Sequence, residues 1–148
     1  MKHLAFLIAS AAAALGAVPE QWVTAVSWVE SSNNPAATGD GTRARGLVQF
    51  WRATWDDCSR VRMAKGLPTW PYSLAYDPTI GRAYAKSWLD HLDARLAAAL
   101  GRKPTIGEVY AAHNLGLSGF TQRGYSLARC PSITQRKARW LSANTVRR

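Results

Sequence analysis

Apolar residues at helical spacing dominate the region that begins at Pro19. Pro19 suits the first position of a helix, because its missing N–H would be unpaired there in any case. Apolar residues follow it at three- and four-residue spacing, namely Trp22, Val23, Val26 and Val29. The polar run at 31–35, which ends in a proline, then stops the helix. Glu30 is therefore expected in the last turn of a half-buried helix.

This position makes Glu30 a candidate general acid. The negative end of the helix dipole and apolar surroundings both favour the protonated form of a carboxyl group. A proton held near neutral pH is what general acid catalysis requires. From position alone, a solvated residue at a helix end is the alternative interpretation.

Four further stretches predict helices, at 53–64, 77–101, 105–116 and 132–143. Asp77 and Pro78 supply an N-cap and a first helical position, and Gly101 closes the same helix. The segments 105–108 and 132–135 both match the capping-box pattern that opens a helix. The segment 36–46 predicts a long irregular loop, which is usually functional in a compact domain. No stretch alternates with period two, so the sequence predicts an all-α fold with few or no strands.

The composition indicates one basic globular domain. The chain has 148 residues, 47% of them hydrophobic, and a formal net charge of +10. Such a surface attracts polyanions, which include nucleic acid, anionic lipid and anionic cell-wall polymer. The basic C-terminal region from Arg129 to Arg148 leaves a nucleic-acid binder open, but no nucleic-acid motif accompanies it, and we expect a solvated face instead.

The N-terminal segment 1–17 is short and basic at its start and then apolar. It resembles a secretory signal, and a buried first helix of the domain is the alternative. Any membrane contact is expected only through this segment. The domain proper is expected at 18–148. The two cysteines, Cys58 and Cys130, show no metal-binding spacing, so neither a metal nor another cofactor is expected.

Four short motifs occur in a fixed order along the chain. They are Val29-Glu30-Ser31 followed by Asn34-Pro35, then Gly46-Leu47-Val48-Gln49-Phe50, then Asp77-Pro78 with Ala83-Tyr84, and finally Ala111-Ala112-His113-Asn114 with Gly116. Together this set resembles the signature segments of soluble lytic transglycosylases of the lysozyme superfamily. The resemblance covers about residues 18–120. It implies a single lysozyme-like domain with long substrate-binding loops.

The resemblance also implies an activity. Family members cleave the β-1,4 bond between N-acetylmuramic acid and N-acetylglucosamine in peptidoglycan, leaving an anhydro-muropeptide. Glu30 would be the single acid and base. A hydrolytic lysozyme would need a second carboxylate, for which Asp40 and Glu108 are the candidates. A non-catalytic wall-binding or virion structural protein of the same fold also remains open.

The motifs carry the expected substrate-binding residues, which are Ser31, Gln49, Phe50, His113 and Asn114. Gln49 and Asn114 offer amides to sugar groups, although either could instead be a helix-end residue. His113 stands where the family usually has a tyrosine that contacts the catalytic glutamate. Three aromatic residues are expected along a sugar groove, namely Trp51, Trp70 and Tyr72. The remaining tryptophans are expected in the core, namely Trp22, Trp28, Trp55 and Trp88.

The expected partner is the peptidoglycan glycan strand, with a phage particle or secretion apparatus as a further candidate. An exported, periplasmic or wall-associated location follows from the signal-like segment. A phage virion, or host cytoplasm before lysis, is the alternative. Because lysozyme-type folds bring late helices back behind the catalytic loop, the resemblance also implies a Cys58–Cys130 disulfide if the chain is exported.

Overall fold

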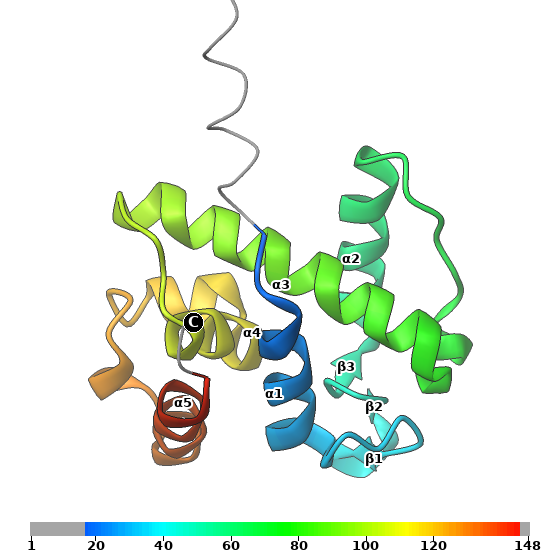
Figure 1. The fold of residues 1–148 in the computed structure, drawn as a ribbon, viewed down its shortest axis with the longest axis horizontal. Helices are drawn as coiled ribbons and strands as arrows, with labels where there is room; N and C mark the ends of the chain where they lie inside the picture. Colours follow the sequence, from blue (N-terminus) through cyan, green and yellow to red (C-terminus); the bar gives the residue numbers. More distant parts are fainter. Residues whose placement is uncertain (1–16, 146–148) are drawn as a thin grey trace, which may run out of the picture.

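Helices make up most of the computed structural model, which describes residues 17–145 (Figure 1). Within these residues five α-helices are present: α1 Glu20–Ser31, α2 Arg52–Ala64, α3 Pro78–Leu100, α4 Ile106–Thr121 and α5 Ser132–Asn144. The predicted all-α, lysozyme-like fold class is confirmed. The segment 1–16, with its predicted signal or first helix, lies outside the described residues. None of the helices in the described region is long and apolar enough to cross a membrane.

Side-chain caps explain where α3 and α4 begin. The Asp77 carboxylate accepts hydrogen bonds from the backbone N–H groups of Thr79 and Ile80. Both halves of the capping box form between Thr105 and Glu108. These two predicted helix starts are confirmed, as is the end of α3, where Gly101 adopts a left-handed conformation with φ 67°.

Two predicted starts need correction. Pro19 is the N-cap of α1 rather than its first residue, and its carbonyl oxygen accepts from Trp22 N. The predicted second capping box is wrong, because α5 begins after Pro131 with no side-chain cap. Gln135 instead donates to the carbonyl oxygens of Ala128 and Cys130, so its amide holds the preceding turn.

The long segment after α1 folds into a small antiparallel sheet. Its strands are β1 Thr38–Gly39, β2 Ala44–Arg45 and β3 Phe50–Trp51, in the order β1-β2-β3. The 3-10 turn η2 Asp40–Thr42 joins the first two strands. Gly46 then turns the chain with φ 76°, and a Cβ there would lie 2.1 Å from the carbonyl oxygen of Ala75. Only glycine fits both conditions, so it permits the close approach of this turn to Ala75, which lies just before α3.

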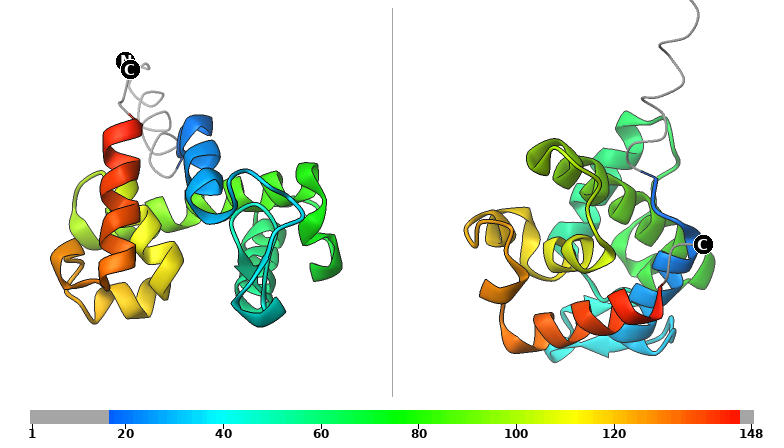
Figure 2. Two further views of the ribbon diagram at one scale, coloured as in Figure 1. Left: turned by 90° about the horizontal axis from the view of Figure 1, so that it is seen from below. Right: turned by 60° about the vertical axis from the view of Figure 1, so that its left-hand side comes forward.

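Helix α3 is the long central element of the fold. Figures 1 and 2 show α2 and the sheet toward one end of α3, α4 and α5 toward the other, and α1 between them. The 3-10 turn η3 Tyr72–Tyr76 precedes α3, and η4 Leu127–Arg129 precedes α5. The core gathers around α3, where the Trp55 ring stacks on Tyr84 with 3.6 Å between ring centres.

The predicted core tryptophans are confirmed with one exception. Trp22, Trp55 and Trp88 are buried, whereas Trp28 is 52% exposed. The buried residues of α1 share one face of the helix, and Trp28 lies on the opposite side. Trp28 lines a surface hollow together with Trp140 of α5.

The predicted disulfide is wrong. Cys58 and Cys130 are both free, buried thiols. Cys58 Sγ donates to the carbonyl oxygen of Tyr84, and Cys130 Sγ donates to that of Ser126. Burial raises the pKa of the Cys58 thiol to about 12, so it remains protonated and unreactive.

Candidate active site

Glu30 lies in the last turn of α1, as predicted, and its side chain is only 10% exposed. Two donors from distant elements converge on one carboxylate oxygen. The Tyr110 hydroxyl of α4 donates to Glu30 Oε1 at 2.7 Å, and Lys137 Nζ of α5 donates to the same atom at 3.0 Å. Within residues 17–145, Oε2 has no hydrogen-bond partner. One oxygen is therefore held while the other is left for a substrate.

Tyr110 is a neutral donor in this arrangement. Its side chain is fully buried. Burial is the largest cause that raises the pKa of Tyr110 far above its usual range, and the neighbouring Glu30 carboxylate raises it further. The hydroxyl therefore keeps its hydrogen at any working pH and orients the carboxylate.

Lys137 supplies the countercharge. Its side chain is 29% exposed, so the ion pair with Glu30 lies at the edge of the core rather than in bulk solvent. An ammonium group at this distance stabilises the ionised carboxylate. The site therefore contains a carboxyl group with a defined orientation and a partly shielded cationic partner.

His113 does not contact Glu30 as its motif position implied. Its Nε2 lies 2.9 Å from the carbonyl oxygen of Val48, which can only accept, so Nε2 carries the hydrogen. Nδ1 is buried and has no hydrogen-bond partner among the described residues. The Tyr110 hydroxyl, from one helical turn earlier, takes the place at the carboxylate. His113 instead ties α4 to the loop before β3.

Burial holds the pKa of His113 below its usual value. Glu30 and the Val48 carbonyl act in the opposite direction, and Lys137 adds to the lowering. The imidazole is therefore neutral at neutral pH, so the cation next to Glu30 is Lys137 rather than His113.

The lowered pKa values of His113 and His91 predict a stability that falls with acidification. The ordinary pKa of histidine, 6.5, applies to their unfolded forms, and the folded protein binds these protons less readily. The unfolded state therefore gains protons first, and stability falls as the pH drops below about 6.5. We expect a lower melting temperature at about pH 5.5 than at about pH 7.5, with a smaller difference for His113→Gln. An equal difference in both proteins would contradict this role for His113.

Ser31 and Gln49 hold the loop around the site. Ser31 Oγ lies 2.7 Å from the Leu47 carbonyl oxygen and 3.0 Å from that of Ser27. Gln49 Nε2 donates to the carbonyl oxygens of Gly46, at 2.9 Å, and Ala37, at 3.2 Å. Gln49 also has a positive φ of 53°, so it belongs to the turn and not to a helix start. A sugar contact by either residue stays a prediction.

Two other predicted substrate-binding residues have different surroundings. The Phe50 ring is 2% exposed and packs edge-on against Trp55, Tyr84 and His113, and substrate binding by Phe50 stays a prediction. Asn114 is exposed, and its Oδ1 accepts from Thr134 Oγ1 at 2.7 Å. The backbone leaves helical geometry at Gly116, with φ 76° and ψ 157°, so Asn114 lies in the last turn before this kink in α4.

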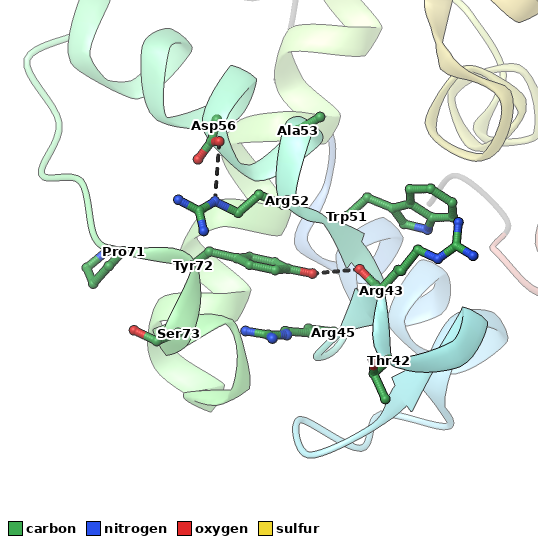
Figure 3. Close-up of a pocket in the computed structure, with 10 residues that line it drawn as sticks. All are labelled: Thr42, Arg43, Arg45, Trp51, Arg52, Ala53, Asp56, Pro71, Tyr72 and Ser73. Atoms are coloured by element: carbon green, nitrogen blue, oxygen red, sulfur yellow. Dashed lines mark hydrogen bonds and ion pairs between the residues drawn. The ribbon is translucent and has the colours of Figure 1, made fainter.

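The predicted groove aromatics separate into two groups. Trp51 is 44% exposed and Tyr72 is buried, and both line a pocket beside the sheet (Figure 3). Trp70 is half-buried. Its backbone N–H donates to the Tyr84 hydroxyl, and its carbonyl oxygen accepts from Trp55 Nε1. Trp70 therefore packs against the edge of the hydrophobic core.

Neither candidate for a second acid is a partner of Glu30. Glu108 is buried in its capping box and forms a bidentate ion pair with Arg102. That pairing, together with hydrogen bonds from Thr105, outweighs burial and lowers the pKa of Glu108. Asp40 is exposed in η2, and its carboxylate accepts from Trp51 Nε1 at 3.1 Å. Of these three acidic residues, Glu30 is thus the one proposed to react with the substrate.

Sequence reasoning missed Tyr110 and Lys137. Tyr110 had one signal, because it lies one turn before His113 on the same helix. Lys137 had none, since its pairing depends on how α5 packs, and the basic residues around it look alike in the sequence.

Comparison with protein-family models matches residues 7–125 to the transglycosylase SLT domain. The comparison with curated proteins found no match. The matched range includes Glu30, Tyr110 and all four sequence motifs, whereas Lys137 lies beyond it. At the family level this domain has activity of the lytic transglycosylase type, with peptidoglycan as substrate. The chain therefore belongs to the transglycosylase SLT family.

Proposed function

We propose that this chain is a peptidoglycan lytic transglycosylase in which Glu30 acts first as acid and then as base. One observation carries the proposal. The buried carboxylate is held at Oε1 by Tyr110 and Lys137, while Oε2 is free of hydrogen bonds within the described residues. A carboxyl group with one fixed and one available oxygen suits proton transfer in both directions.

In the first half of the proposed reaction, protonated Glu30 gives its proton to the glycosidic oxygen. The bond between that oxygen and the muramoyl C1 breaks, and the N-acetylglucosamine end leaves with the new hydroxyl. Glu30 is then a carboxylate, which Tyr110 and Lys137 stabilise through Oε1.

In the second half, the muramoyl 6-hydroxyl attacks C1 and gives its proton to Glu30. The new bond closes the anhydro ring, and the proton from the 6-hydroxyl replaces the one that Glu30 gave to the leaving group. The proton balance is complete without water. The same residue therefore serves both steps, and no second carboxylate is needed.

Lys137 bears most on the state that follows the first proton transfer, because its ammonium group lies 3.0 Å from Glu30 Oε1. We expect Lys137→Met to lower kcat about tenfold, since the carboxylate formed in the first half loses a charged hydrogen bond worth about 1.5–3 kcal/mol. Initial rates on purified peptidoglycan at saturating substrate measure this loss. Arg139→Met is a matched control, since Arg139 is an exposed cation of the same helix. A wild-type kcat for Lys137→Met would contradict the role assigned to the ion pair.

Hydrolysis by the same fold is the second candidate. It requires a carboxylate positioned to serve as nucleophile or to activate a water. The engagement of Glu108 with Arg102 and the exposure of Asp40 favour the transglycosylase outcome. Digestion of purified peptidoglycan distinguishes the two, because transglycosylation leaves anhydro ends and hydrolysis leaves reducing ends. A binding protein would release neither product.

The basic surface and the wall substrate support a location at the cell wall. A net charge of +10 favours approach to an anionic wall by long-range attraction. We propose an exported or periplasmic enzyme, with a phage particle as the alternative carrier. Detection of the native chain in wall or periplasmic fractions, rather than in the cytoplasm, tests this assignment.

A further inference from the structure

A second site lies beside the sheet, where a pocket of about 810 Å³ opens between β2, β3, α2 and η3 (Figure 3). Three arginines line it, namely Arg43, Arg45 and Arg52, and we call it the arginine pocket. Glu30 is not among its lining residues. The proposed catalytic carboxylate therefore does not line this pocket.

Aromatic rings arrange the three guanidinium groups. Figure 3 shows the Tyr72 ring between Arg45 and Arg52, whose guanidinium carbons lie 4.4 and 6.0 Å from the ring centre. Arg43 lies over the Trp51 ring at 5.6 Å. The Tyr72 hydroxyl donates to the carbonyl oxygens of Arg43, at 2.8 Å, and Phe50, at 2.6 Å, which fixes the ring. The cations are thus held in place before any ligand arrives.

The pocket has an excess of unpaired positive charge. Among the described residues, Arg43 and Arg45 form no ion pair, and Arg45 Nε is buried without a hydrogen-bond partner. Arg52 pairs with Asp56 at 3.5 Å, and both of these side chains are exposed. Guanidinium groups match planar oxyanions through paired N–H donors, so the chemistry of these side chains suits an oxyanion ligand.

We propose that the arginine pocket binds the carboxylates of the peptide stems carried by peptidoglycan. This inference rests on the proposed function, because it assigns a part of the same substrate. Asp56 adds a carboxylate at the rim, which would repel a continuous polyanion but can accept an ammonium group. The exposed Trp51 ring adds an apolar wall. A short peptide with both charge types and aliphatic side chains fits this combination better than a polyphosphate chain does.

Strand β3 connects the pocket to the catalytic centre. Trp51 faces the pocket, and the adjacent Phe50 packs against His113, which binds Val48 near Glu30. On this proposal, a glycan strand seated at Glu30 brings its peptide substituents to the arginine pocket. Binding there would position the strand and make cleavage depend on the stems.

The double variant Arg43→Gln/Arg45→Gln tests the proposal on two substrates. One is peptide-bearing glycan, and the other is the same glycan after an amidase has removed the stems. We expect kcat/KM to fall about tenfold on the peptide-bearing glycan, since charged hydrogen bonds are lost, and to change little on the stripped glycan. Arg60→Gln/Arg95→Gln removes the same charge from exposed positions of α2 and α3 and is the control. Arg43→Gln alone serves if the double variant melts early.

Calorimetry with a free stem peptide gives a readout that does not require cleavage. We expect the peptide to bind the wild type, to bind the double variant at least about tenfold more weakly, and to lose affinity when its carboxylates are amidated. Equal losses on both glycans, or binding of polyglycerol phosphate in place of the peptide, would overturn the assignment. If the wild type binds the peptide but cleaves no glycan, the proposed function fails and the pocket stands. If it cleaves glycan and ignores the peptide, only the pocket fails.

Discussion

Replacing Glu30 with glutamine is expected to lower peptidoglycan cleavage by about 10²–10⁴-fold, the contribution of general acid–base catalysis. Glutamine keeps the size of the side chain and an oxygen that can accept from the Tyr110 hydroxyl. It has no transferable proton of suitable acidity. Initial rates of muropeptide release from purified peptidoglycan measure the effect.

The fold of Glu30→Gln should remain intact. Lys137 loses its ion pair, but its side chain is 29% exposed and its ammonium can be solvated. Glu20→Gln is the matched control, because Glu20 belongs to the same helix, is exposed and pairs with Arg82 at 2.8 Å. That variant should cleave at the wild-type rate. Residual activity of Glu30→Gln above about a hundredth of wild type would rule out Glu30 as the essential acid and base.

Tyr110→Phe is expected to lower kcat by about 10- to 100-fold with little change in KM. The substitution removes only the hydroxyl that donates to Glu30 Oε1 at 2.7 Å. A hydrogen bond to a charged group contributes about 1.5–3 kcal/mol, and here it orients the reacting carboxylate. Because the ring stays in place, the loss should appear in catalysis and not in glycan binding.

Tyr76→Phe provides the control for Tyr110→Phe. The Tyr76 hydroxyl lies 3.1 Å from Thr38 Oγ1 on an exposed part of the molecule and has no contact with Glu30. Michaelis–Menten parameters of the two variants should therefore separate. Wild-type kcat in Tyr110→Phe would show that Lys137 alone is sufficient to hold the carboxylate.

Local sequence signals predicted the parts of the fold that depend on local chemistry. Asp77 with Pro78, Gly101, and the pair Thr105 and Glu108 mark helix ends because each satisfies backbone groups within a few residues. The place of Glu30 followed in the same way from the apolar face of α1 and the polar run after it. The Ser132 segment matched a capping pattern but failed, because Gln135 found carbonyl partners in the preceding turn instead.

The contacts that build the site depend on packing across the chain. Tyr110 is 80 residues from Glu30 and Lys137 is 107 residues away. The spacing of residues within one helix or loop cannot predict contacts between residues so far apart in the sequence. The same reason explains the disulfide error, since Cys58 packs against α3 whereas Cys130 lies at the start of α5.

Motif membership also does not say whether a side chain faces substrate or core. Phe50 and His113 match the motifs, yet the first is buried and the second binds a backbone carbonyl. These two side chains hold the loop that contains Val48, because Phe50 packs against His113 and His113 binds the Val48 carbonyl oxygen. Conversely, Trp28 was expected in the core as a tryptophan, although its position in α1 lies opposite the buried face and it is 52% exposed.

Digestion of peptidoglycan in heavy-oxygen water tests the central claim most directly. In the proposed reaction the muramoyl 6-hydroxyl takes the place of water, so no solvent oxygen enters the product. Mass spectrometry of muropeptides released by the wild type should show anhydro ends without heavy oxygen, and Glu30→Gln should release almost none. Reducing-end muropeptides that carry one heavy oxygen would show hydrolysis and would contradict the account.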